Sequence, residues 1–186
     1  MRQRRASATS RQYVTANQLV RDSFRLARKI YDSGYRPDIL LVLWRGGTPV
    51  GIVVHEFLLY QGIDAWHTAI KAESYQGIGQ RTRPRIDSLT AILRRVKKTS
   101  RILIVDDIFD TGCTLKKVTE LLRRKTKAIR TATLFYKPSR NRTDLKPDFF
   151  IRKTDRWIVF PHELMGLTPA EIRRKDPSIA RLIRGD

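Results

Sequence analysis

The sequence ILIVDDIFDTGCTL, residues 102–115, decides the fold because it joins a buried strand to the start of a helix. Its first four residues form a short apolar run, which is typical of a central parallel strand with both faces covered. Carboxylates follow at Asp106, Asp107 and Asp110. A threonine, a glycine and a second threonine then lead into the next helix. Ligands of open α/β sheets bind beyond the carboxyl ends of the strands, so the segment also predicts a binding site.

The residue types after this strand indicate a ligand that carries both a phosphate and a diol. Backbone N–H groups and hydroxyls at a helix start suit a phosphate, and Gly112 permits close approach of the backbone. Paired carboxylates suit vicinal sugar hydroxyls or a hydrated Mg²⁺, so a ribose phosphate satisfies both requirements. The alternative is a capped turn with solvated aspartates, which fits an isolated Asp-Asp pair better than the whole run. The segment does not match a Walker-type phosphate loop.

The whole chain fits one α/β domain. It has 186 residues, of which 41% are hydrophobic, enough to form a core. No apolar run is long enough to span a bilayer, and the basic N-terminus lacks the apolar segment of a secretory signal. Cys113 is the single cysteine, which excludes an intrachain disulfide and fits a reducing compartment. We therefore expect a cytoplasmic protein with no membrane partner.

Alternating strands and helices favour a central, mainly parallel sheet flanked by helices. Strands are expected at 39–43, 63–69, 102–105, 129–136 and 157–160, and helices at 50–60, 87–98 and 114–125. A further helix begins at a capping box of Thr15 and Gln18 and stops near Gly34. Residues 1–12 are predicted to be a basic mobile tail and residues 13–165 the domain. Residues 166–186 are predicted to be a basic helical extension, with a second capping box at Thr168.

Residues 102–115 resemble the phosphoribosyl pyrophosphate (PRPP) signature of the type I phosphoribosyltransferases. The resemblance implies the fold of that family, with a small hood that carries the base site. It implies that Asp106 and Asp107 hold the ribose hydroxyls. The 5′-phosphate would be cradled by Asp110, Thr111, Gly112, Cys113 and Thr114. Purine-using members carry an acid by N7 of the base at the position of Asp110, which is the candidate catalytic residue.

Two loops resemble other parts of these enzymes. Residues 43–51, LWRGGTPVG, resemble the pyrophosphate loop, in which Arg45, Gly46 and Gly47 would bind the anion. Family members often have a non-proline cis peptide bond here, by resemblance between residues 44 and 45. The long loop 71–86 resembles the mobile catalytic loop, and its Ser74 and Tyr75 match the family's Ser-Tyr pair. An ordinary Arg-Gly-Gly loop and a merely disordered basic loop are the respective alternatives.

The resemblance also implies a purine base site. Lys137, in a Lys-Pro unit, matches the lysine that donates to the 6-oxygen in 6-oxopurine enzymes, and Trp157 matches the aromatic residue that stacks on the ring. The main chain of Ile158 would read the ring edge. Core packing is the alternative role of Trp157. His162 and Glu163 stand where xanthine-guanine enzymes usually carry Trp and Asp, which leaves the choice among guanine, hypoxanthine and xanthine open, and His162 is equally explained as a surface residue.

The implied activity is transfer of phosphoribose from Mg²⁺-bound PRPP to a 6-oxopurine, giving a purine nucleoside monophosphate and pyrophosphate in purine salvage. The metal would be held by Asp106, Asp107 and Glu163, directly or through water. Adenine and orotate are the runner-up bases, although Lys137 is a donor and disfavours the amino group of adenine. A homo-oligomer, dimer or tetramer, is implied as well.

The net charge keeps a second function class open. Lys plus Arg is 38 and Asp plus Glu is 18, which gives a formal charge of +20. Basic segments lie at 81–85, 94–98, 123–127 and 173–175. A PRPP-sensing regulator that binds nucleic acid on the same fold would explain this excess. However, the sequence contains no helix-turn-helix, zinc-finger spacing or aromatic-rich RNA motif.

Overall fold

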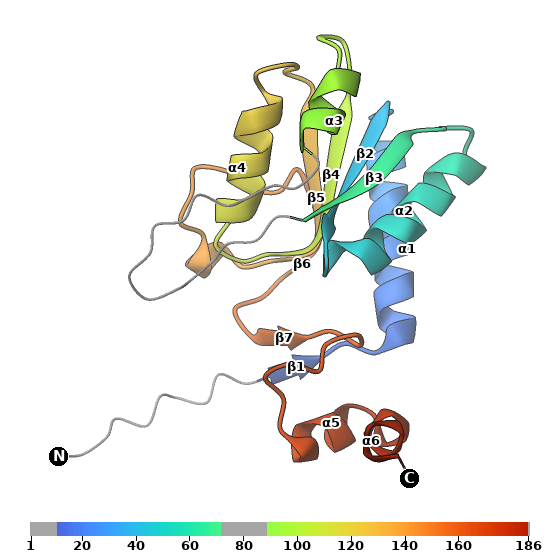
Figure 1. The fold of residues 1–186 in the computed structure, drawn as a ribbon, viewed down its shortest axis with the longest axis vertical. Helices are drawn as coiled ribbons and strands as arrows, with labels where there is room; N and C mark the ends of the chain where they lie inside the picture. Colours follow the sequence, from blue (N-terminus) through green and yellow to red (C-terminus); the bar gives the residue numbers. More distant parts are fainter. Residues whose placement is uncertain (1–10, 72–88, 186) are drawn as a thin grey trace, which may run out of the picture. The chain divides into compact units, whose positions relative to one another are not determined.

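The computed structural model describes residues 11–71 and 89–185. The described chain divides into two compact units (Figure 1). The main unit comprises the described residues between Val20 and Asp155, and the second comprises those up to Leu19 and from Arg156 onward. The predicted α/β class is confirmed, because the main unit is built on a parallel sheet flanked by helices.

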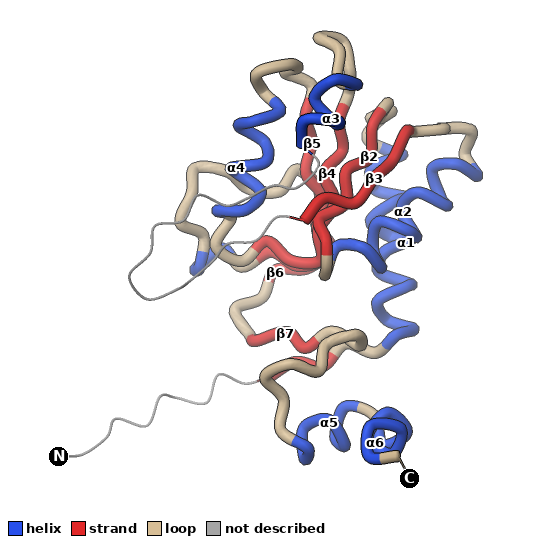
Figure 2. Tube along the Cα trace, in the orientation of Figure 1, coloured by secondary structure: helices blue, strands red, loops and turns tan. Residues whose placement is uncertain are grey.

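Five parallel strands form the sheet of the main unit, in the order β3–β2–β4–β5–β6 (Figure 2). Their bounds are β2 Ile39–Trp44, β3 Trp66–Lys71, β4 Ile102–Phe109, β5 Ile129–Tyr136 and β6 Phe149–Lys153. Val42 of β2 pairs with Val105 of β4, so the carboxyl ends of these two strands lie next to each other. The sequence did not predict β6, because its five residues FFIRK end in two charges and lack an aliphatic run.

Four helices and a 3₁₀ turn complete the main unit. The helices are α1 Ala16–Asp32, whose first residues belong to the second unit, α2 Gly47–Tyr60, α3 Leu89–Arg95 and α4 Cys113–Leu122, and the turn is η1 Pro138–Arg140. α3 and α4 lie on one face of the sheet and α2 on the other (Figure 1). Leu41 and Ile104 pack with Leu115 of α4 in one core cluster. Successive side chains of a strand point to opposite faces.

Three element boundaries differ from the expected ones and bear on the site. β4 continues to Phe109, so the acidic residues 106 and 107 belong to the strand and not to the turn after it. α2 begins at Gly47 instead of Val50. Pro49 then falls in the first turn, where its missing N–H removes no helical hydrogen bond. β3 begins at Trp66, three residues later than expected.

The second unit contains a two-stranded parallel sheet of β1 (Arg11–Tyr13) and β7 (Trp157–Val159). Residues 11 and 12, predicted to be part of the mobile tail, are therefore ordered in a strand, and β7 is not a strand of the main sheet. Arg11 also forms an ion pair with Glu171 at 2.6 Å. A local sequence cannot show that two short segments so far apart will pair.

The end of the chain forms two short helices, α5 Pro169–Lys175 and α6 Pro177–Arg184, within the second unit. The capping box predicted at Thr168 is confirmed, because Thr168 Oγ1 accepts from the Glu171 N–H and the Glu171 carboxylate accepts from the Thr168 N–H. Asp176 caps α6 and separates it from α5. No helix among the described residues is long and apolar enough to cross a membrane.

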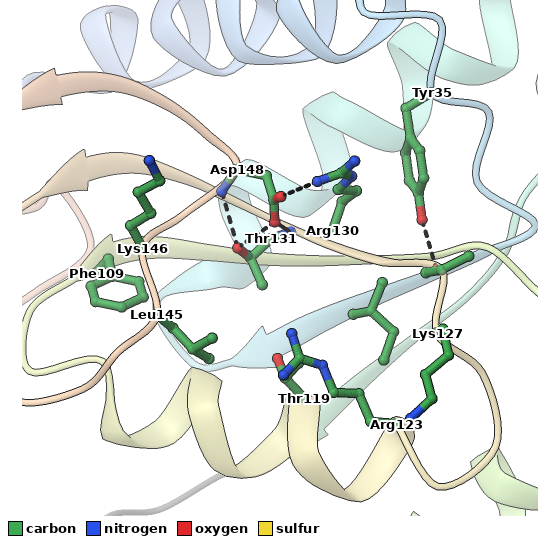
Figure 3. Close-up of a pocket in the computed structure, with 12 residues that line it drawn as sticks. Tyr35, Phe109, Thr119, Arg123, Lys127, Arg130, Thr131, Leu145, Lys146 and Asp148 are labelled. Carbon is green, nitrogen blue, oxygen red and sulfur yellow. Dashed lines mark hydrogen bonds and ion pairs between the residues drawn. The ribbon is translucent and has the colours of Figure 1, made fainter.

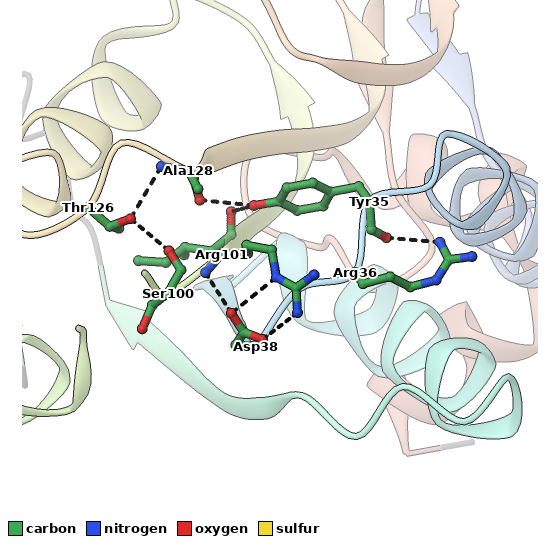
Figure 4. A network of polar contacts seen from close by, with 8 residues as sticks. Tyr35, Arg36, Asp38, Ser100, Arg101, Thr126 and Ala128 are labelled. Atoms are coloured by element: carbon green, nitrogen blue, oxygen red, sulfur yellow. Dashed lines mark hydrogen bonds and ion pairs between the residues drawn. The ribbon is translucent and has the colours of Figure 1, made fainter. Parts of the chain in front are cut away.

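A polar network fixes the amino ends of β2, β4 and β5 (Figure 4). The Tyr35 hydroxyl lies 2.8 Å from the Ile102 carbonyl oxygen and 3.0 Å from that of Ala128. Burial raises the pKa of this hydroxyl well above its usual value. Asp38 accepts hydrogen bonds from the Arg101 backbone N–H at 2.8 Å and from its guanidinium at 2.7 Å. These contacts join segments that are 60 or more residues apart and fix how the strands line up.

Asp22 ties α1 to β6 through a buried carboxylate. Its side chain is 3% exposed and accepts hydrogen bonds from Arg152 at 3.1 Å and Arg25 at 2.8 Å. We expect Asp22→Ala to lower the free energy of unfolding by about 2 kcal/mol, because two guanidinium groups lose their partner. Urea unfolding, monitored by circular dichroism, measures this change in the free energy of unfolding. Asp32→Ala, which removes the exposed partner of Arg28 on the same helix, is the control. Equal destabilisation by both substitutions would contradict the assignment.

Candidate active site

The candidate site forms where β2 and β4 end side by side and the chain after β2 passes directly over the β4 acids. A Cβ atom built on Gly46 would overlap the Asp107 carboxylate. One built on Gly47 would lie 2.7 Å from the Val105 carbonyl oxygen and 2.9 Å from Asp106 Cα. Any side chain at these two positions would push the loop away. From the sequence, these glycines are predicted to let the backbone approach an anion. The structure shows that the approach of the loop to the acids requires them.

Asp106 and Asp107 form a crowded carboxylate pair. The Asp107 residue is 7% exposed, and its backbone N–H donates to Asp106 Oδ1 at 2.9 Å. Burial, and then the charge of Asp107, raises the pKa of the Asp106 carboxyl well above its usual range. A half-buried and a buried acid this close disfavour the doubly charged form. A cation or a set of hydroxyl donors would relieve the repulsion, so these residues fit both a sugar diol and a divalent ion.

The turn after β4 leads into α4 through Gly112, which has φ +77° and serves as the helix N-cap. A Cβ atom there would lie 2.5 Å from the Phe109 ring and 2.7 Å from Thr143 Oγ1. Gly112 has no side chain with which to cap the helix, and the Cys113 N–H donates only a long hydrogen bond, 3.5 Å, to Thr111 Oγ1. Thr111 and Thr114 are half-buried and Cys113 is exposed. Free N–H groups beside hydroxyls at a helix N-terminus are the arrangement that binds a phosphate.

Asp110 lies between two cations that come from the end of β5. Arg140 Nε donates to Asp110 Oδ1 at 2.6 Å, and Lys137 Nζ lies 3.7 Å from Asp110 Oδ2. Lys137 is 3% exposed, and its backbone N–H donates to the Phe109 carbonyl. The sequence motifs predict Asp110 and Lys137 as separate site residues and do not predict Arg140. The signal that could have identified Arg140 is its spacing from Lys137. The two residues are three positions apart, so one short turn carries both cations next to Asp110.

The predicted pyrophosphate residues directly follow β2. Arg45 is exposed, and the peptide bond between Trp44 and Arg45 is cis, as the resemblance implied. Arg45 directly precedes Gly46, the N-cap of α2, and Gly47, its first residue. The predicted pair Ser74 and Tyr75 lies outside the described residues.

The hood residues belong to the second unit. Trp157 is 50% exposed, whereas Ile158 is buried in the short sheet. The His162 ring stacks on Phe160 at 5.7 Å between centroids. The Glu163 carboxylate accepts a hydrogen bond from the Phe160 backbone N–H at 3.0 Å. Glu163 therefore has a local structural role, and its predicted role at a metal stays a prediction. Among residues 11–71 and 89–185, no three His, Cys, Asp or Glu side chains form a metal-binding group.

Comparison with known proteins shows the family. The family model for the phosphoribosyl transferase domain matches residues 10–165. The chain belongs to this family. A purine phosphoribosyltransferase of known structure from Pyrococcus horikoshii is 30% identical, with a TM-score of 0.68, and the match covers 85% of this chain and 97% of that one. The resemblance to the type I phosphoribosyltransferases is thereby confirmed.

Two further relatives of this phosphoribosyltransferase domain carry purine names. A hypoxanthine-guanine phosphoribosyltransferase of Staphylococcus epidermidis is 38% identical over 82 residues, which cover 44% of each chain. The chain therefore matches less than half the length of the curated relatives. A xanthine-guanine-hypoxanthine phosphoribosyltransferase of Helicobacter pylori is 24% identical, with a TM-score of 0.61 over 82% of this chain and 91% of its own, and shares the fold.

The left-handed Gly112, in the turn between β4 and α4, gives a stability prediction. Gly112→Ala is expected to lower the free energy of unfolding by about 2 to 3 kcal/mol, because the new Cβ strains the backbone and collides with Phe109. Gly34→Ala is the matched control, since Gly34 has φ +78° with nothing within 4 Å. It should lose only about 1 kcal/mol, from backbone strain alone. Urea unfolding compares the two, and equal losses would show that the Phe109 contact is unimportant.

Proposed function

We propose that the protein is a purine phosphoribosyltransferase that transfers phosphoribose from PRPP to a 6-oxopurine: guanine, hypoxanthine or xanthine. The C1–O bond to pyrophosphate breaks, the C1–N9 bond to the purine forms, and the purine loses a proton. The products are a purine nucleoside 5′-monophosphate and pyrophosphate. The observation that carries the proposal is the close approach of Gly46 to the Asp107 carboxylate, next to a start of α4 whose N-cap residue, Gly112, has no side chain.

The groups of PRPP match three adjoining parts of the main unit. The ribose hydroxyls would donate to the Asp106 and Asp107 carboxylates. The 5′-phosphate would accept from the backbone N–H groups and hydroxyls of residues 110–114. The pyrophosphate would bind the loop of Arg45, Gly46 and Gly47, where a guanidinium stabilises the negative charge that develops as the group leaves.

The carboxylate pair would hold Mg²⁺, directly or through water. Oxygen ligands suit this ion, and the raised pKa of Asp106 marks a place where positive charge is favourable. When bound, Mg²⁺ supplies electrostatic stabilisation of the departing pyrophosphate. Asp106 and Asp107 would also favour the positive charge that builds at C1 of the ribose.

The base would be read by Lys137, Trp157 and Ile158. A lysine is a donor and prefers a 6-oxo group to a 6-amino group. Asp110 would accept the proton at N7 of the purine. The ion pair of Arg140 with Asp110, at 2.6 Å, supports this role because it fixes the direction in which the carboxylate points. Arg140 is thus a positioning residue.

Other parts of the proposal rest on the family and the sequence. The enzyme would be a cytoplasmic homo-oligomer, a dimer or tetramer, that acts in purine salvage. Staphylococcal relatives named for hypoxanthine and guanine support the purine class.

The direct test is pyrophosphate release from PRPP and Mg²⁺ with guanine, hypoxanthine, xanthine, adenine and orotate offered in parallel. We expect turnover with at least one 6-oxopurine and none above background with adenine or orotate. Asp106→Asn with Asp107→Asn should abolish turnover with every base. Preferred use of adenine or orotate would contradict the assigned base, and the absence of turnover with all five would overturn the enzymatic proposal.

Replacement of the buried lysine tests base recognition. Lys137→Ala should raise the KM for the 6-oxopurine about tenfold to a hundredfold, because a charge-assisted hydrogen bond is lost. The KM for PRPP should change less than about threefold, since the ribose and phosphate contacts remain. Lys153→Ala, which removes an exposed lysine of β6, serves as the control and should match the wild type. Wild-type kinetics in Lys137→Ala would exclude Lys137 from the base site.

A further inference from the structure

A cavity of about 380 Å³ lies between α4, the start of β5 and the segment that leads into β6 (Figure 3). Its cationic part is separate from the candidate active site. α4 begins at the phosphate turn, and Arg123 of the cavity follows the other end of the helix. A ten-residue helix is roughly 15 Å long, so Arg123 and Lys127, which follow its carboxyl end, lie about that far from the helix start. Lys146 lies beside Phe109, at the other end of the cavity (Figure 3).

Three of the cations that line this cavity form no ion pair with an acid among the described residues. Arg123, Lys127 and Lys146 are exposed, and none of them forms an ion pair within the part of the chain that the structure describes. The acid in the lining, Asp148, is already engaged. It forms an ion pair with Arg130 at 2.6 Å and accepts from the Thr131 N–H at 2.8 Å (Figure 3). The cavity therefore carries a net positive charge that the described residues do not neutralise.

A buried hydroxyl in the lining gives independent support. Thr119 is 3% exposed, and its Oγ1 has no hydrogen-bond partner among the described residues. A buried polar group without a partner is unfavourable by about 1 to 3 kcal/mol, so native proteins rarely keep one. Thr119 and Arg123 are four residues apart, which puts both on the same side of α4. The hydroxyl and the guanidinium are thus available to one anionic ligand.

The rest of the lining is apolar or neutral. Phe109, Ile129 and Leu145 contribute to it. The Tyr35 hydroxyl is held by backbone carbonyls and presents no further donor. A cavity whose lining has both cations and apolar side chains suits a ligand that has both a phosphate and an apolar part. Its volume is within the usual range for small-molecule sites, roughly 300 to 1,000 Å³.

We propose that this cavity is a second anion site, which binds a small phosphate ester through Arg123, Lys127 and Thr119. The proposed transfer reaction does not involve the basic segment 123–127. The second site would give this segment a specific ligand. The proposal does not depend on the proposed transfer reaction, since no residue of the active site takes part in this site. A nucleic acid backbone is the competing source of phosphate groups.

Backbone amide shifts in ¹H–¹⁵N spectra of the full chain test the site, with phenyl phosphate as the probe and phenol as its uncharged analogue. We expect saturable shifts at residues 119, 123 and 127–129 with phenyl phosphate and none with phenol. Arg123→Ala combined with Lys127→Ala should weaken this binding about tenfold or more. Thr119→Val, which keeps the shape but removes the hydroxyl, should weaken it about threefold or more.

The matched control combines Arg124→Ala with Lys125→Ala, which removes the same charge from exposed neighbours outside the cavity lining. It should leave phenyl phosphate binding within about twofold of the wild type, because distant exposed charges are screened by salt. Equal weakening by the two double variants would show only diffuse attraction and overturn the proposal. Unchanged cavity amides, or larger shifts there with a single-stranded oligonucleotide than with phenyl phosphate, would also overturn it. Shifts at residues 111–114 report the active site separately.

Discussion

The candidate site depends on the close approach of two glycines to two acids. β2 and β4 pair in register up to Val42 and Val105, so the chain that leaves β2 must cross the end of β4. Gly46 and Gly47 allow this crossing, because a Cβ atom on either would collide with the acidic segment of β4. The loop that follows one strand thereby meets the carboxylates that end the next, and the α4 helix start completes the group.

The same packing explains why the acids are chemically unusual. Asp106 and Asp107 belong to a strand and not to a solvated turn, so burial and mutual repulsion raise the pKa of Asp106. Asp110, by contrast, lies beyond the strand and is held by Arg140 and Lys137. Three acids within five positions thus experience two electrostatic environments. The environment of Asp106 and Asp107 favours a cation or sugar hydroxyls. The environment of Asp110 fixes its carboxylate next to Lys137, the residue proposed to read the base.

The charge of +20 has a different meaning once residues are located. Some cations have structural partners, such as Arg101 with Asp38 and Arg152 with Asp22. In the second unit, Lys175 donates to the Glu163 carbonyl and Arg174 lies over the Tyr13 ring. Arg123 and Lys127 instead line a cavity without an acidic partner among the described residues. The excess charge is therefore not one uniform surface for a polyanion.

Local sequence patterns suffice to predict the parallel α/β core and the order of its chemical groups along the chain. Apolar runs such as residues 102–105 must be buried, and a glycine followed by threonine at a helix start is a local signal, so both can be read without a structure. Tertiary structure alone decided which distant groups meet. It added β6 and the pairing of β1 with β7, it brought Arg140 to Asp110, and it put Gly46 against Asp107. The physical reason is that strand register and loop crossing depend on packing between segments tens of residues apart, and periodicity and local motifs carry no information about it.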